Sequence, residues 1–349
     1  MTTSWVMGLL VGVVYFLIGG FLSLLVVPAV ILKAILGGSK GIRGLFKRRL
    51  HNQLPKVAEM KFQHDFVRTK SGTRFHYVHT GSEDSPLMLC LHGFPECWYS
   101  WRHILEKFSG KFHVVALDMR GYGESDKPSS IGEYHIDYLV NDVREVIIGL
   151  GYEKAVIVGH DWGGVIAWEI PLFYPEVVNK LIIMSAPSRK AFMEYLMGNV
   201  LQVLSSWYIF FFQIPFLPEF VFAVNDYQFF EKFMNQGENK LSSEEVEIYK
   251  NSVARFLNYG INYYRACNPM YKGLKMKRVT KQIVQPTLLL WGKKDKAISH
   301  KCIDYIQKYL PQLSVGFLEE ASHWVVHERP DEVCLFMENF LERDDDVSS

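Results

Sequence analysis

The chain has 349 residues, of which 49% are hydrophobic and 14% aromatic, enough to bury the core of one large domain with an insertion. Its formal net charge of +1 provides no overall field for binding nucleic acid. The five cysteines are scattered and form no C-x-x-C pair, so we expect neither a disulfide framework nor a metal site.

The first predicted element is an apolar helix. Residues 5–32 carry no charge and are long enough to cross a bilayer, so we expect the membrane to be a partner of this segment. Six basic residues follow between positions 33 and 49, and the first acidic residue is Glu59. The positive-inside rule then predicts a single-pass protein whose remaining chain faces the cytosol. A cleaved signal peptide is disfavoured because no basic segment precedes the long apolar run, and a hairpin or peripheral anchor is a further alternative.

The segment after residue 60 has the pattern of an α/β domain. Residues 61–80 alternate polar and apolar around Gly72, which predicts a hairpin. Continuous apolar runs predict strands buried on both faces, with helical stretches such as 136–149 between them: residues 87–91, 114–117, 155–158, 181–184, 287–291 and 313–318. This alternation predicts a mostly parallel sheet with helices on both faces.

The stretch 187–275 differs from its surroundings, since it has weak strand signal and many aromatic residues. We interpret it as a helical lid over the carboxyl edge of the sheet. Most of its aromatics are expected to form the lid's own core, and a minority to line an apolar cavity. The predicted units are a membrane anchor with a basic linker (1–60), the first part of the core (61–186), the lid (187–275), the second part of the core (276–343) and an acidic tail (344–349).

An aspartate occupies the centre of the turn that follows the strand at 155–158. Gly159-His160-Asp161-Trp162-Gly163 has the G-x-S-x-G pattern of a nucleophile elbow, with Asp161 in the place of the serine. A serine there would attack acyl carbons, whereas a carboxylate can displace a leaving group at an sp3 carbon and form an ester on the enzyme. A serine esterase is therefore excluded at this turn.

Removing such an ester requires an activated water. The expected order along the chain is nucleophile, acid and histidine, and Asp295 and His323 supply it, each directly after a predicted strand. Among twelve histidines, His323 stands out by this position. We predict that His323 is the general base, that Asp295 orients it, and that the backbone N–H groups of Phe94 and Trp162 form an oxyanion hole.

Several motifs together carry a resemblance to a known family. They are His92-Gly93-Phe94-Pro95-Glu96, Gly159-His160-Asp161-Trp162-Gly163-Gly164, Trp291-Gly292-x-x-Asp295 and Ser322-His323-Trp324, supported by the stretches 98–102 and 120–126. Over residues 62–342 the chain resembles the epoxide hydrolases of the α/β-hydrolase fold. With its N-terminal apolar segment it is most similar to the membrane-anchored members, epoxide hydrolases 3 and 4.

The resemblance implies a two-step reaction without a cofactor, at the endoplasmic reticulum. It also implies two lid tyrosines that hold the epoxide oxygen, matched by Tyr208 before a Gln-x-Pro turn and by Tyr264 in an Asn-x-Tyr-Arg run, with Tyr263 as the alternative. Opening an epoxide releases an alkoxide, which is a poor leaving group unless it is protonated or strongly hydrogen-bonded. A phenol suits this task, because it is neutral at pH 7 and can still protonate an alkoxide. Trp162 and Trp324 are expected to contact the substrate.

The predicted function is addition of water to a lipophilic epoxide, such as that of a fatty acid, to give a vicinal diol. A haloalkane dehalogenase uses the same fold and the same three catalytic groups but needs no paired phenols. A non-catalytic membrane protein that binds lipids or partners would need none of Asp161, Asp295 and His323. The sequence indicates no oligomeric state.

Overall fold

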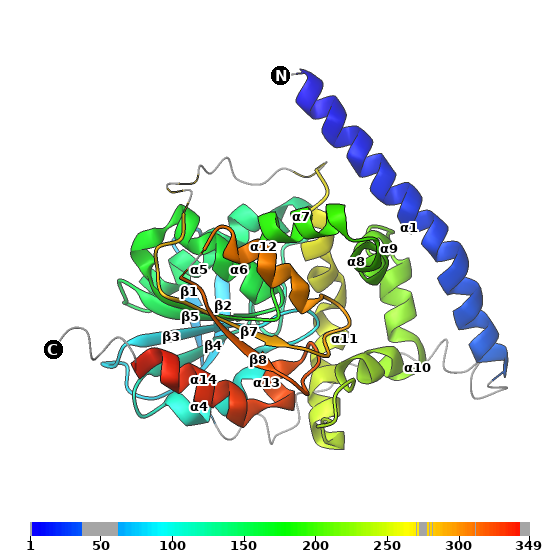
Figure 1. The fold of residues 1–349 in the computed structure, drawn as a ribbon. Helices are drawn as coiled ribbons and strands as arrows, with labels where there is room; N and C mark the ends of the chain where they lie inside the picture. The colour runs from blue at the N-terminus through cyan, green and yellow to red at the C-terminus, as the bar shows by residue number, and fades with distance from the viewer. Residues whose placement is uncertain are drawn as a thin grey trace.

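The computed structural model describes residues 2–36, 62–269, 271, 278, 280, 282–310 and 312–342 (Figure 1). The predicted acidic tail and most of the predicted basic linker lie outside these residues.

An eight-stranded sheet forms the centre of the molecule, in the order β1-β2-β4-β3-β5-β6-β7-β8. β1 and β2 form an antiparallel hairpin, β2 is antiparallel to β4, and all the other neighbours are parallel. The strands are Gln63–Arg68, Arg74–Thr80, Leu87–Leu91, His113–Leu117, Ala155–His160, Val178–Met184, Thr287–Gly292 and Ser314–Leu318, in chain order from β1 to β8. The predicted hairpin and the six predicted strands are confirmed, but β8 is an edge strand in which Phe317 is exposed, so the prediction that it is buried on both faces is wrong.

Helices cover both faces of this sheet, which is why the central strands β3, β4 and β5 are buried at every position and mostly apolar. Leu89 and Ile157 belong to the core on one face, while their strand neighbours Cys90 and Val158 belong to the core on the other. α5 (Ile136–Gly149) and α6 (Trp162–Phe173) pack on the first face, and α4 (Arg102–Phe108) and α14 (Pro330–Glu342) on the second (Figure 1). Shorter helices complete the core: η1 (Trp98–Trp101), η2 (Ile131–Tyr134), η3 (Pro175–Val177), η4 (His300–Cys302), α12 (Ile303–Gln307) and α13 (Val325–Glu328).

Five helices lie between β6 and β7 and cover the carboxyl ends of the strands. They are α7 (Arg189–Gly198), α8 (Val200–Ser205), α9 (Trp207–Phe211), α10 (Leu217–Met234) and α11 (Ser243–Ala266). A capping box between Ser242 and Glu245 fixes the start of α11. Phe211 and Phe230 are buried among these helices away from the cavity, whereas Phe212 and Phe222 line it. The lid aromatics therefore divide between a packed interior and positions that reach a cavity.

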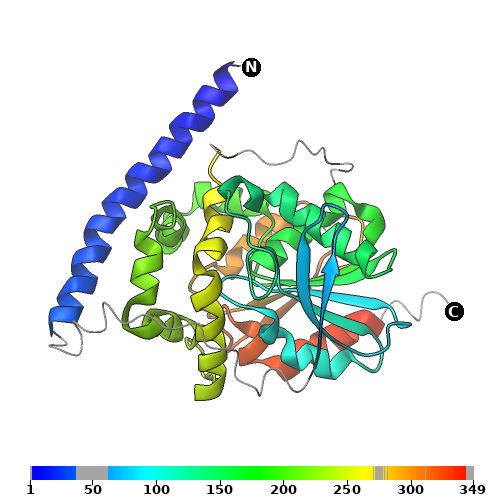
Figure 2. The ribbon, with the colours of Figure 1, turned by 180° about the vertical axis from the view of Figure 1, so that it is seen from behind.

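The N-terminal helix α1 (Thr2–Leu36) runs alongside the lid, as both views show (Figure 1, Figure 2). Its segment Val13–Leu32 has a mean hydropathy of 2.4 and is long and apolar enough to cross a membrane. The ring of Tyr15 stacks on Phe210 of α9 with centroids 5.1 Å apart. A Cβ atom at Gly19 would collide with the carbonyl oxygen of Phe210, so glycine permits this close approach of the two helices.

Candidate active site

Asp161 stands on a sharp turn between β5 and α6. Its backbone has φ 49° and ψ −117°, a strained conformation that raises the side chain above the carboxyl edge of the sheet. A Cβ atom at Gly163 would collide with the carbonyl oxygen of Leu91, and one at Gly159 with the backbone of Gly163. The two glycines of the motif are therefore required by the close approach of β3 and α6 around the turn.

Asp161, His323 and Asp295 meet at the ends of three strands. Nε2 of His323 lies 3.5 Å from Oδ2 of Asp161, and Nδ1 of His323 lies 2.8 Å from Oδ2 of Asp295. The other oxygen of Asp295 accepts the backbone N–H groups of Ala297 and Ile298, at 2.8 and 2.9 Å. Asp295 is thus held by its own loop in the position that orients the imidazole.

The two carboxylates control the charge of the histidine. Burial alone would lower the pKa of His323, but the charges and hydrogen bonds of Asp295 and Asp161 outweigh it and raise that pKa well above its usual value. The two carboxylates therefore favour the protonated form of His323.

One predicted oxyanion donor contacts the nucleophile directly. The backbone N–H of Phe94 donates to Oδ1 of Asp161 at 2.7 Å. Trp162 is the first residue of α6, where backbone N–H groups have no intrahelical acceptor. Oδ1 therefore faces the N–H of Phe94 and Oδ2 faces His323, while the role of the Trp162 N–H in an oxyanion hole stays a prediction.

A cavity of about 190 Å³ lies between Asp161 and the lid. Tyr208 and Tyr264 line it together with Asp161 and His323. The remaining lining residues are mostly aromatic: Phe94, Ser205, Trp207, Phe212, Phe222, Phe229, Phe233, Gln236, Lys296 and Ala297. The site therefore presents a few polar groups in an apolar enclosure, as small-molecule sites usually do.

The structure separates the two neighbouring tyrosines of α11. Tyr264 lines the cavity, with its ring 5.9 Å from that of Tyr208 and nearly perpendicular to it. Tyr263 instead donates its hydroxyl to the carbonyl of Arg120 at 2.8 Å, away from the cavity. Burial and the nearby Asp161 charge raise the pKa of both Tyr208 and Tyr264 above its usual value, so both phenols are neutral at pH 7.

The two tryptophans expected to contact substrate lie outside the cavity lining formed by the described residues. Trp324 is buried beneath His323, because its indole N–H donates to the carbonyl of Phe233 at 2.9 Å. Trp162 packs its ring edge-on against Tyr264, 5.1 Å away, and is hydrogen-bonded to it. Trp324 therefore packs against His323 and Trp162 against Tyr264, and a direct contact of either tryptophan with substrate stays a prediction.

Comparisons with known proteins agree with this geometry. Residues 86–330 match the alpha/beta hydrolase fold family. The chain is 42% identical to epoxide hydrolase 4 of Homo sapiens over 80% of its own length and 79% of that protein, and 40% identical to epoxide hydrolase 3 of Xenopus tropicalis over 81% and 78%. It also superposes, with a TM-score of 0.72 and 34% identity, on a mutant epoxide hydrolase from Bacillus megaterium bound to its diol product, covering 80% of this chain and 100% of that one.

The chain belongs to the epoxide hydrolase family of the alpha/beta hydrolase fold.

In this member of the family, a buried ion pair that sequence reasoning missed supports the loop of the base. Nδ1 of His160 lies 2.7 Å from Oε2 of Glu96, and Nε2 lies 2.8 Å from the carbonyl oxygen of His323. Both acceptors lack a proton, so both ring nitrogens must donate and His160 is an imidazolium. The Glu96 charge raises the pKa of His160 against the effect of burial, and in return His160 lowers the pKa of Glu96 to about 2. The sequence predicts that His160 packs away from the nucleophile but does not reveal this partner.

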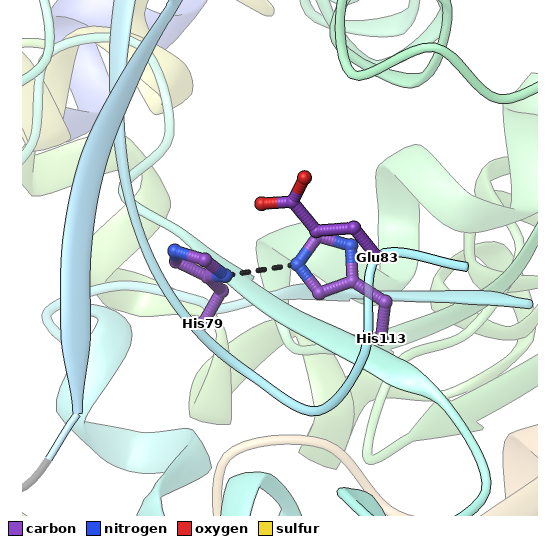
Figure 3. A group of neighbouring side chains, drawn as sticks. All are labelled: His79, Glu83 and His113. Carbon is purple, nitrogen blue, oxygen red and sulfur yellow. Dashed lines mark hydrogen bonds between the residues drawn. The ribbon is translucent and has the colours of Figure 1, made fainter. Parts of the chain in front are cut away.

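A second group of titratable side chains lies at the opposite end of the sheet of this family member. His79, Glu83 and His113 offer three potential metal ligands within 4.8 Å of one another (Figure 3). The two imidazoles hydrogen-bond to each other at 2.9 Å, and the free side of His113 contacts the hydroxyl of Tyr152 at 2.8 Å. Because His113 begins β4 while the catalytic groups follow strand ends, this group has no access to the cavity.

Proposed function

We propose that this protein adds water to lipophilic epoxides and releases vicinal diols. One observation carries the proposal: a carboxylate nucleophile, a carboxylate-oriented histidine and two neutral phenols converge on one apolar cavity. The histidine and carboxylates suit any ester-forming hydrolase of this fold, whereas the phenols suit a departing alkoxide. A haloalkane dehalogenase would place N–H donors where Tyr208 and Tyr264 stand.

In the first step, Oδ2 of Asp161 attacks an epoxide carbon and the ring C–O bond breaks. Tyr208 and Tyr264 face the same cavity as the nucleophile, so they stabilise the departing oxygen and one of them protonates it. Oδ1 is the less suitable attacking atom because it accepts the N–H of Phe94. The products are a glycol monoester of Asp161 and a tyrosinate.

In the second step, His323 removes a proton from water, and the hydroxide attacks the carbonyl carbon of the ester. Formation of the ester removes the charge of Asp161, so the pKa of His323 falls. The imidazolium then gives its proton to the tyrosinate, which restores the phenol and leaves a neutral imidazole as the base. The N–H groups of Phe94 and Trp162 stabilise the negative charge on Oδ1. The ester C–O bond then breaks, and the proton of the new Asp161 carboxyl group passes to the alkoxide of the departing diol. His323 keeps the proton it took from water, which restores the starting state of the site.

The substrate class and the location form part of the proposal. Aromatic side chains dominate the cavity lining, which favours lipophilic epoxides such as those of fatty acids. The apolar helix α1 supports a membrane anchor, at the endoplasmic reticulum with the catalytic domain on the cytosolic side.

A single turnover in ¹⁸O-labelled water tests the mechanism. Water attacks the ester carbonyl, so the label should enter Asp161, and the diol should carry an unlabelled oxygen from the enzyme. In His323→Gln, the ester should accumulate as a mass adduct on the peptide that contains Asp161. Label found directly in the diol, or the absence of an adduct in this variant, would exclude the covalent route.

A further inference from the structure

An apolar surface lies on the outside of the lid. It consists of Met193, Met197, Val200, Leu201 and Leu204 on α7 and α8, all exposed to solvent, with Leu201 at 75%. We name these five residues the α7–α8 patch. Single exposed apolar residues are common on proteins, but here five of them occur on two consecutive helices within residues 193–204, and this concentration indicates an interaction surface.

The α8 part of this patch lies in an uncharged stretch, because no charged residue occurs between Glu194 and Glu219 and the whole of α8 and α9 is uncharged. On α7, Glu194 lies between Met193 and Met197 and accepts a hydrogen bond from the hydroxyl of Tyr309. Glu219 is paired with Arg265 at 2.7 Å. A protein partner is usually met with charged residues around an apolar centre, whereas hydrocarbon disfavours charge on the surface it contacts. The composition of α8 and α9 therefore favours lipid.

The docking of α1 places the lid beside the membrane segment. Contacts with the rest of the protein extend from Tyr15 to Val30, which is nearly the whole of the apolar stretch. Gly19 lies against Phe210 of α9 and against Ile214, which follows α9 in the chain. The lid helices α9 and α10 therefore lie beside the apolar stretch of α1 (Figure 1, Figure 2).

The cavity lies directly beneath the same segment. Ser205, Trp207 and Tyr208, at the end of α8 and in α9, line the cavity, while Leu201 and Leu204, one turn earlier, face outwards. One layer of short helices therefore separates the nucleophile's cavity from the patch.

We propose that the α7–α8 patch inserts into the lipid bilayer and that the cavity receives its substrate from the hydrocarbon phase. The proposal that the patch inserts into lipid depends only on the α7–α8 patch and on the position of α1. The proposal that an epoxide reaches the cavity from the bilayer rests on the proposed function.

Insertion is tested with the full-length protein in phosphatidylcholine vesicles. A bimane label is placed at Leu201→Cys in a Cys267→Ser background, since the other four cysteines are buried. Brominated acyl chains should quench the label at position 201 roughly twofold or more, and aqueous iodide should quench it weakly. The matched control is Leu335→Cys on α14, an exposed leucine on the opposite side of the core, which iodide alone should quench. Iodide quenching at position 201 equal to that at position 335 would overturn the insertion.

Delivery is tested by kinetics on two substrates. The double variant Val200→Glu with Leu201→Glu should raise KM about fivefold for a long-chain epoxide dissolved in the vesicles, because charged side chains disfavour burial of this surface in lipid. The kcat for a small water-soluble epoxide should be unchanged, and Leu335→Glu should affect neither. An unchanged KM for the vesicle-borne epoxide would overturn delivery. Absence of diol from any epoxide would contradict the proposed function but leave the quenching result standing.

Discussion

Nε2 of His323 lies 3.5 Å from Oδ2 of Asp161, so the nucleophile and the base form an ion pair before substrate arrives. The charge and the hydrogen bond of Asp161 are among the causes that raise the pKa of His323, so they favour its protonated form, which cannot activate water. In the proposed mechanism, ester formation removes the charge of Asp161 and therefore favours the neutral imidazole. This one contact would make ester formation precede ester hydrolysis.

Asp161→Asn should lower the pKa of His323, since the amide carries no charge to stabilise the imidazolium. The side-chain ¹⁵N NMR signals of the histidines, titrated in micelles, measure this pKa, and a His323→Gln spectrum assigns the signal. The variant should also lose diol formation while its thermal unfolding midpoint stays near that of the wild type. An unaltered His323 titration would show that Asp161 does not control the base.

Tyr208→Phe and Tyr264→Phe should each slow ester formation about 100-fold, comparable to the loss of one oxyanion donor. Stopped-flow single-turnover kinetics measures this step separately from hydrolysis of the ester. Tyr263→Phe is the matched control, because this variant removes a neighbouring hydroxyl that bonds to the backbone of Arg120. It should cost about 1 kcal/mol of unfolding free energy and leave the first step unaltered. Equal losses in all three variants would contradict the assignment of the donors.

The strands and the catalytic groups could be predicted because both depend on local patterns. Asp161, Asp295 and His323 each follow an apolar run that requires a buried strand, and the carboxyl ends of parallel strands meet at one edge. The roles of Tyr263 and Tyr264 could not be separated in this way. Adjacent helical residues point about 100° apart, and only the packing of α11 on the core decides which of them reaches the cavity.

Other parts of the site depend on contacts between distant residues. Glu96 and His160 are 64 positions apart, and neither lies in a pattern that marks a buried pair. The inward position of Trp324 follows from a hydrogen bond to a lid carbonyl, which no sequence period records. The docking of α1 on α9 likewise depends on where Gly19 meets Phe210 after folding.

Glu96→Gln should destabilise the protein by about 3 kcal/mol at pH 7, because His160 then lacks the charge that keeps it protonated. The pKa of Glu96 is lowered to about 2 in the folded state, so its contribution is fully present above about pH 4.5. It is lost as pH falls through about 2, so the difference between variant and wild type should shrink over that range. Chemical unfolding in detergent at several pH values measures this. Glu153→Gln, at an exposed position, should change stability by less than about 0.5 kcal/mol.

His327 should make the fold sensitive to mild acid. Burial lowers its pKa to about 4, and its Nε2 has no hydrogen-bond partner among the described residues. Between pH 6.5 and 4, His327 therefore binds a proton in the unfolded chain but not in the folded protein, so stability falls as pH falls. The loss from pH 6.5 to pH 5 should be about 2 kcal/mol.

Chemical unfolding in detergent at pH 7 and pH 5 tests whether His327 makes the stability fall as the pH falls. His327→Gln carries no titrating group, so its stability should fall by about 2 kcal/mol less than that of the wild type over this interval. His300→Gln, which removes a partly exposed imidazole, should keep the wild-type slope. A His327→Gln profile parallel to the wild type would show that the folded state accommodates a protonated His327, for which a rearrangement around Nε2 would be required.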